Sequence, residues 1–310
     1  MSQLYRIGVD ENGLGARLGP LVVTAVGARL DERGERTLSR RLPRSIAADL
    51  DDSKRLVSHS SFSLGEAWAR AVVPEPSGPA ELFAALSLES AQALTAPCPR
   101  HVEAQCWSPA GQAFGASEAD VERLRSHLSK LEARGVCVTT IRTSVVCTKR
   151  LNEANDVGHH RFVADLHAME RLVLELRREA GVEILAICGK VGGIADYGSY
   201  FGPLSERLFA VLEQGRARSA YRFPGVGELH FVRDADASCP LVMLASLVGK
   251  WVRELLMERV ARFYLDASAG DRLPSGYNDP VTKRFIAVTA PHRQQLAVPD
   301  TCFMRDQANG

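Results

Sequence analysis

The chain has 310 residues, of which 45% are hydrophobic, so the sequence predicts a globular protein with a substantial buried core. Its formal net charge of +1 excludes attraction of polyanions by a globally basic surface, so any polyanion must be met by a local patch. Seven scattered cysteines without a Cys-x-x-Cys pair favour free thiols in a reducing compartment. Since no stretch reaches membrane-spanning length, we expect a cytoplasmic protein with no membrane partner.

The first predicted strand, Tyr5 to Asp10, ends in two carboxylates, Asp10 and Glu11, and a glycine-rich turn follows. Side chains alternate across a strand, so both carboxylates share one site only if the strand stops there and the turn redirects one of them. Adjacent carboxylates repel each other unless a proton or cation lies between them, and oxygen ligands suit Mg2+ or Mn2+. A metal site is the leading interpretation, with a phosphate cradle or a solvated hairpin turn as alternatives.

The next predicted element is a second hairpin strand at residues 20–30, which is rich in valine and alanine. A polar cluster around Ser53 and Lys54 comes before a predicted helix. A short and a long donor side chain suit a phosphate, but the same residues also suit a helix start with solvated charge. Both interpretations stay open from the sequence.

Two helices are predicted at residues 61–73 and 79–95, separated by a proline-rich loop that interrupts any helix. We interpret residues 96–135 as an insertion because their first half has weak periodicity and their second half is highly charged. β-branched residues return at 136–147 and predict a strand.

The second half of the chain is predicted to begin with an amphipathic helix at residues 159–179. The apolar run 182–189, which contains Cys188, is typical of a central strand covered on both faces. A helix near residues 203–214 and a strand near 229–233 complete this part of the prediction.

A long amphipathic helix is predicted at residues 240–264, and Asp236 lies just before it. A carboxylate at a helix start is favourable even without chemistry, so a capping role is the alternative to a functional one. The turn-rich tail, residues 273–283, comes before a short predicted helix.

Several short motifs follow one another along nearly the whole chain, apart from the 96–135 insertion. They resemble the successive motifs of type 2 ribonuclease H. In chain order the motifs are Asp10-Glu11-Asn12-Gly13-Leu14-Gly15 with Gly19-Pro20, Asp52-Ser53-Lys54, Leu151-Asn152-Glu153, Ala235-Asp236-Ala237 followed by Ala245-Ser246-Leu247-Val248-Gly249-Lys250, and Ser275-Gly276-Tyr277. The last of these motifs is nearest the archaeal and eukaryotic branch of the family.

The resemblance implies a ribonuclease H-like α/β fold, with a mixed central sheet flanked by helices and a C-terminal helical and turn extension. It divides the chain into a catalytic-type domain, residues 1–265, and an extension, residues 266–310, packed on it. The implied activity is endonucleolytic hydrolysis of the RNA strand of RNA/DNA hybrids, or at ribonucleotides embedded in a duplex, with Mg2+ or Mn2+ at two sites. No obligate protein partner is evident.

Carried over by position, Asp10, Glu11 and Asp236 match three of the four metal-binding acids of that family. Cys188 stands where the family has the remaining aspartate, and a largely neutral thiol is a poor replacement for a hard carboxylate. Asp196, in the next loop, is a candidate to supply the lost carboxylate.

The resemblance also implies contacts with the substrate. Leu14 departs from the family pattern because its side chain donates no hydrogen bond, although the backbone amides of its neighbours remain. The basic and hydroxyl side chains are candidate phosphate contacts, and the tyrosine is a candidate to pack on a sugar. The predicted substrate-binding residues are Gly13, Leu14, Gly15, Ser53, Lys54, Lys250 and Tyr277.

Two functional hypotheses therefore remain from the sequence. The first is an active metal-dependent endoribonuclease, and the second is an inactive homologue that binds hybrid or duplex nucleic acid or serves as an interaction module. A related phosphodiester-transfer enzyme with another substrate is a more remote alternative, because function resides in sites and not in folds.

Overall fold

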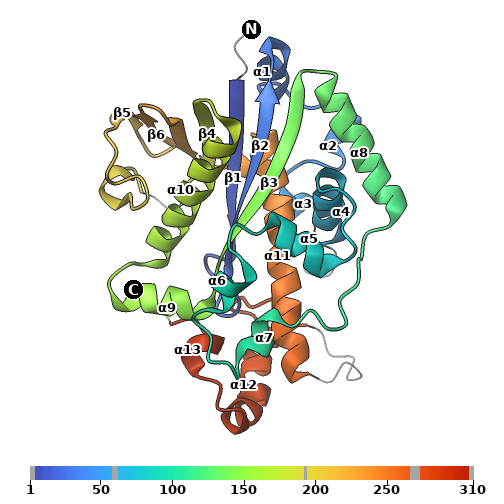
Figure 1. The fold of residues 1–310 in the computed structure, drawn as a ribbon, viewed down its shortest axis with the longest axis vertical. Helices are drawn as coiled ribbons and strands as arrows, with labels where there is room; N and C mark the ends of the chain where they lie inside the picture. The colour runs from blue at the N-terminus through green and yellow to red at the C-terminus, as the bar shows by residue number, and fades with distance from the viewer. Residues whose placement is uncertain (1–3, 58–61, 192–193, 266–272, 307–310) are drawn as a thin grey trace.

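A mixed sheet forms the centre of the protein in the computed structural model, which describes residues 4–57, 62–191, 194–265 and 273–306. Seven strands of these residues pair in the order β3-β2-β1-β4-β7-β6-β5 (Figure 1). The pairs β1–β4 and β4–β7 are parallel, and the other pairs are antiparallel. The strands are β1 (Leu4–Asn12), β2 (Leu21–Leu30), β3 (Val136–Val146), β4 (Ile184–Gly189), β5 (Ala210–Gln214), β6 (Arg218–Phe223) and β7 (Gly227–Val232).

Two long helices cover the two faces of the sheet. Helix α11 (Pro240–Tyr264) packs on one face, and α10 (Arg161–Ala180) packs on the other (Figure 1). Gly8 of β1 permits the close approach of α11, because a Cβ at that position would lie 2.4 Å from the Leu241 carbonyl carbon. Each face has its own hydrophobic cluster, one around Trp251 and one around Met169.

Shorter helices surround this core. Helix α4 packs beside α11, α8 packs outside α4 and against β3, and the helices near the C-terminus lie below the sheet (Figure 1). These elements are α1 (Glu32–Leu38), α2 (Arg44–Ala47), α3 (Ser53–Leu56), α4 (Ser63–Val72), α5 (Pro79–Leu86), α6 (Ala91–Thr95), α7 (Glu103–Trp107), α8 (Glu118–Glu132), α9 (Thr148–Asp156), the 3-10 turns η1 (Gly198–Tyr200) and η2 (Ala235–Ala237), α12 (Pro280–Gln295) and α13 (Asp300–Phe303).

A third hydrophobic cluster joins segments that are far apart in the sequence. Leu18 of the glycine-rich turn, Met257 of α11, Phe285 of α12 and Phe303 of α13 are all buried in it. Residue 18 also forms an isolated β-bridge with Met304. The C-terminal segment therefore lies directly against the turn that follows β1.

The structure confirms the predicted mixed sheet flanked by helices, and several of its elements. The strands predicted at 5–10, 20–30 and 136–147 are present, the run 182–189 is the central strand β4, and the helix at 240–264 has the predicted bounds. Within the described part of the chain, no helix is both long and apolar enough to cross a bilayer.

Two helix predictions are wrong. Residues 210–214 form strand β5, which pairs with β6 at the edge of the sheet. The helix predicted at 79–95 is two helices, because the Leu88 amide leaves the helical pattern and donates to the Thr143 carbonyl of β3. Helix α9 was not predicted. In each case pairing or packing with a distant segment overrides the local pattern.

Candidate active site

A cleft lies at the carboxyl end of β1, where strand, turn, helix and tail residues meet. Its walls come from the end of β1 and the turn after it, the start of α3, the turn η2, one side of α11 and the tail loop. The lining residues are Asp10, Glu11, Asn12, Gly13, Leu14, Gly15, Ser53, Lys54, Asp236, Ser246, Lys250, Arg253, Glu254 and Tyr277.

Four carboxylates line this cleft: Asp10 and Glu11 from β1, Asp236 from η2, and Glu254 from α11, which is paired with Arg253. Burial raises the pKa of Asp10 well above its usual range, and the charges of Glu11 and Asp236 raise it further. A hydrogen bond with the Ser246 hydroxyl acts in the opposite direction. Burial likewise raises the pKa of Glu11 to about 8, and the charge of Asp165 adds to the shift. These carboxylates therefore lack sufficient positive charge around them.

This donor set fits a hard divalent cation. Carboxylate oxygens are the ligands that Mg2+ and Mn2+ prefer, and a bound cation would offset both the burial of these charges and the repulsion between neighbouring carboxylates. Among the residues described by the structure, no three Asp, Glu, His or Cys side chains already stand close enough to hold an ion. Binding would therefore require the side chains to turn toward one another.

Lys54 supplies a nearby positive charge. Its ammonium lies 2.9 Å from Asp236 Oδ2, and this hydrogen bond raises the pKa of Lys54. Helix α3 positions the lysine, because the Asp52 side chain caps the helix by accepting from the Lys54 amide. The adjacent Ser53 hydroxyl lies 3.0 Å from that of Ser246 and joins α3 to α11. The polar cluster is thus both a helix start and part of the cleft.

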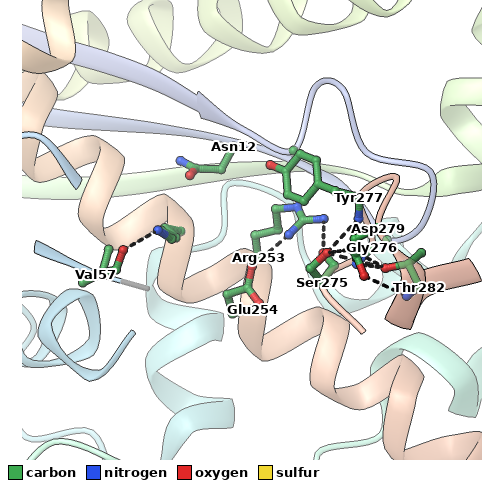
Figure 2. A network of polar contacts seen from close by, with 12 residues as sticks. Asn12, Val57, Arg253, Glu254, Ser275, Gly276, Tyr277, Asp279 and Thr282 are labelled. Carbon is green, nitrogen blue, oxygen red and sulfur yellow. Dashed lines mark hydrogen bonds and ion pairs between the residues drawn. The ribbon is translucent and has the colours of Figure 1, made fainter. Parts of the chain in front are cut away.

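Helix α11 presents residues 246, 250, 253 and 254 to the cleft, a spacing that lies on one side of a helix. The ammonium of Lys250 donates to the Val57 carbonyl at 3.0 Å, and burial lowers its pKa. The buried guanidinium of Arg253 pairs with Glu254 at 2.9 Å and donates to the Ser275 carbonyl at 3.0 Å (Figure 2). The arginine therefore connects the helix to the tail.

The glycine turn is held from below by the C-terminal segment. Arg305, which is 2% exposed, donates to the Gly13 carbonyl at 2.6 Å and to the Gly19 carbonyl at 2.7 Å. Gly13 has φ +90°, and a Cβ there would meet Arg253 Nε at 2.4 Å, so this position requires glycine. Leu14 is half-buried against the hydrophobic cluster under α10.

Tyr277 closes the tail side of the cleft. The Arg253 guanidinium lies 4.6 Å from the centre of its ring, and its backbone amide donates to the Ser275 hydroxyl at 3.1 Å. Figure 2 shows the ring next to the Arg253 guanidinium. This arrangement fixes an aromatic face at the edge of the cleft.

The structure thus brings together every predicted site residue except Cys188. That side chain is fully buried in the cluster that contains Val9, and burial raises the pKa of its thiol, so it stays neutral at pH 7. The neighbouring Gly189 faces the carboxylates instead, because a Cβ there would lie 3.1 Å from Asp10 Oδ1 and 3.3 Å from Glu11 Oε2. The prediction that Cys188 stands in the place of a missing acid is therefore not confirmed, and Gly189 is the residue of β4 that faces Asp10 and Glu11.

Asp196 does not line the cleft. Its carboxylate accepts hydrogen bonds from the Gly198 amide, the Ser199 hydroxyl and the Gln214 amide group, at 2.9, 2.6 and 2.9 Å. These contacts lower its pKa. The suggestion that Asp196 replaces the lost carboxylate is therefore not supported by its contacts.

Sequence reasoning missed Asp165, Arg253 and Arg305. The signal for Asp165 was a charged residue between Phe162 and Met169 on the apolar side of a predicted helix. Arg305 carried no comparable signal, because its contacts with the glycine turn join residues almost 300 positions apart in the chain.

No protein-family model matches the sequence, and no curated protein is similar to it. Solved structures that resemble this one include a point mutant of Bst-RNase HIII, with 17% identity and a TM-score of 0.49 over 97% of this chain and 66% of the other. Bst-RNase HIII in complex with Mn2+ has 15% identity and a TM-score of 0.46, again over 97% and 66%. RNase HII in the PCNA complex from Archaeoglobus fulgidus has 16% identity and a TM-score of 0.42 over 99% and 96%. The chain thus spans 66% of the length of the first two.

Proposed function

We propose that this protein is a divalent-cation-dependent endonuclease that cuts the RNA strand of RNA/DNA hybrids or of ribonucleotide-containing duplexes. One observation carries the proposal. Residues from position 10 to position 277, which belong to separate motifs of the resemblance to type 2 ribonuclease H, line one cleft. Carboxylates and lysines stand together there, as hydrolysis of a phosphodiester requires.

In this proposal Asp10, Glu11 and Asp236 hold Mg2+ or Mn2+. The bound cation supplies an activated water and neutralises charge on the phosphate. Lys54, which pairs with Asp236 at 2.9 Å, would be the donor to a phosphate oxygen of the nucleic acid. Lys250 stays anchored to the Val57 carbonyl and adds positive charge along the cleft wall.

The turn and the tail would position the ribose next to the cut. The amides of Gly13 and Gly15 are backbone donors that need no side chain, so Leu14 does not remove them. Tyr277 offers a flat apolar ring for a sugar face, held in place by Arg253.

A second candidate function is binding of the hybrid without cleavage. It is favoured by the end of β4, where Gly189 adds no side chain beside Asp10 and Glu11 and the Cys188 thiol is buried. A site with fewer carboxylates holds a divalent cation less tightly, whereas the lysines that contact phosphate are unaffected.

Cleavage is tested with the purified full-length protein, an end-labelled RNA/DNA hybrid, and Mg2+ or Mn2+. We expect cuts in the RNA strand by the wild type and by the control variant Asp196→Asn, and none by Asp10→Asn. Failure of the wild type to cut at high protein concentration in both metals would overturn the proposed cleavage. Hybrid binding that persists without cutting would support the second function.

Binding of the hybrid is tested by its salt dependence. Lys54→Met is expected to weaken binding and to reduce the slope of log K against log salt concentration by about 1, because one phosphate contact is lost. Arg55→Met is the matched control, since Arg55 is an exposed cation one residue away that pairs with Asp51 outside the cleft. Equal effects of both variants would show that Lys54 has no specific phosphate contact.

A further inference from the structure

Asp165 is a buried acid without a partner. It lies on α10, is 0% exposed, and neither carboxylate oxygen has a hydrogen-bond partner among the described residues. By contrast, the buried glutamates all have hydrogen-bond or ion-pair partners. Glu66 and Glu170 accept backbone N–H hydrogen bonds, and Glu254 pairs with Arg253.

The surroundings of Asp165 are the carboxylates at the end of β1. Burial raises the pKa of Asp165 well above its usual range, and the charge of Asp10 raises it further. Apart from burial, Asp165 is the largest influence on the pKa of Glu11, ahead of Asp236. Asp165 belongs to α10, which packs on the face of the sheet opposite to α11, so its charge acts on the pair from that side.

Neither protonation state of Asp165 is satisfied by the protein alone. An ionised carboxylate this deeply buried needs donors or a cation, and it has no hydrogen-bond donor in the described part of the chain. A protonated carboxyl needs an acceptor for its O–H, and the same observation leaves it without one. A bound cation would compensate the charge of the ionised Asp165 carboxylate.

The end of strand β4 places no side chain beside Asp10 and Glu11. A side chain at Gly189 would point at Asp10 and Glu11, but glycine has none, and the neighbouring thiol of Cys188 is neutral. The end of β4 therefore contributes no carboxylate beside this pair, whereas α10 carries the buried carboxylate of Asp165.

We propose that Asp165 is a cation ligand of this protein and that, with Asp10 and Glu11, it forms a divalent-cation site on the α10 side of β1. This inference rests on the proposed function for the identity of the cation, Mg2+ or Mn2+. Asp236 lines the cleft from the turn before α11 and would add a carboxylate from the opposite face of the sheet. The side chains turn toward the ion as it enters from the cleft.

The test is direct binding of Mn2+ to the full-length protein without nucleic acid, measured by calorimetric titration and by the Mn2+-induced rise in melting temperature. Asp165→Asn keeps the shape of the side chain and removes its charge. We expect it to bind Mn2+ at least about tenfold more weakly. Without metal it should melt no lower than the wild type, because the Asp165 carboxylate makes no hydrogen bond with the described residues that the substitution could remove. Asp196→Asn, an aspartate engaged elsewhere, should match the wild type in Mn2+ affinity.

Unchanged Mn2+ affinity in a folded Asp165→Asn protein would overturn the inference. Should that variant fail to fold, Gly189→Asp in the wild-type background replaces it, since an acid there would compete with Asp165 for the same ion and change the Mn2+ affinity. No change in that variant would likewise overturn the inference. If Mn2+ binding depends on Asp165 but the wild type does not cut hybrids, the inference about Asp165 holds and the proposed nuclease is rejected. If the wild type cuts hybrids but Mn2+ binding does not depend on Asp165, the proposed nuclease holds and the inference is rejected.

Discussion

Glu170 shows how a single buried acid makes stability depend on pH. It is 0% exposed on α10 and accepts the Leu204 amide at 2.8 Å, which ties the loop after η1 to the helix. Burial raises its pKa from 4.5 to about 7, against the opposing effect of the backbone donors. The folded state therefore binds the proton more tightly than the unfolded state.

The sign of the effect follows from that difference. Because the folded pKa is the higher one, the contribution of Glu170 to stability decreases as pH rises from 4.5 through about 7 and is constant above that. This corresponds to roughly 3 kcal/mol. We expect the free energy of unfolding of the wild type to fall by about this amount relative to Glu170→Gln between pH 4.5 and pH 8, in urea titrations.

Glu175→Gln is the control for this experiment. A hydrogen bond from Arg178 lowers the pKa of Glu175, so its contribution to stability has the opposite dependence on pH. A wild-type profile that runs parallel to that of Glu170→Gln would show that Glu170 does not titrate between these pH values.

At the same scale, the sequence was sufficient to find most residues of the cleft but not their full set. Asp10, Glu11 and Asp236 were found because their residue types and motif order indicate chemistry before any contact is known. Asp165 was not, because a polar residue on an apolar helix face says nothing about which strand end lies opposite. Gly189 was overlooked in favour of Cys188 because the direction of a side chain depends on where the strand ends.

Among the elements, prediction succeeded where the pattern is long or strongly apolar. Helix α11 was predicted to its ends because its apolar periodicity extends over 25 residues. Strand β5 was predicted as a helix because all of its five residues are exposed, so no alternation marks it. Its conformation comes from pairing with β6, which local sequence does not encode.

One contact between elements leads to a prediction about the glycine turn. Arg305 donates to the carbonyls of Gly13 and Gly19 from a fully buried position after α13. Arg305→Ala removes the charged donor from both carbonyls and leaves them only the longer bonds from the Ala16 amide and the Thr148 hydroxyl, so we expect the free energy of unfolding to drop by roughly 3 kcal/mol. Hydrogen exchange of the amides in residues 13–19 should become faster before global unfolding does.

Arg284→Ala is the comparison variant for this test, since residue 284 is an exposed arginine of the neighbouring helix α12. It should leave both stability and exchange in residues 13–19 unchanged. Equal behaviour of the two variants would mean that the tail does not hold the turn.

For the whole molecule, the arrangement of cores bears on how the chain is divided. The sequence predicted a domain of residues 1–265 with a packed extension, and this division remains a prediction. The third hydrophobic cluster takes Leu18, Met257, Phe285 and Phe303 from both sides of that boundary. The described part of the C-terminal segment thus buries its apolar side chains with residues of the preceding segment.

We therefore predict that the protein unfolds in a single calorimetric transition that includes the C-terminal segment. Phe303 is 2% exposed and its ring lies 5.9 Å from that of Phe285. Phe303→Ala should cost about 3–5 kcal/mol and move the whole transition down by roughly 10 °C, because the cavity is shared by both segments. Val288→Ala, at an exposed site of α12, should change it little. A separate early transition that contains only the C-terminal segment would instead show that residues 266–310 unfold independently, as an extension merely docked on a self-sufficient domain.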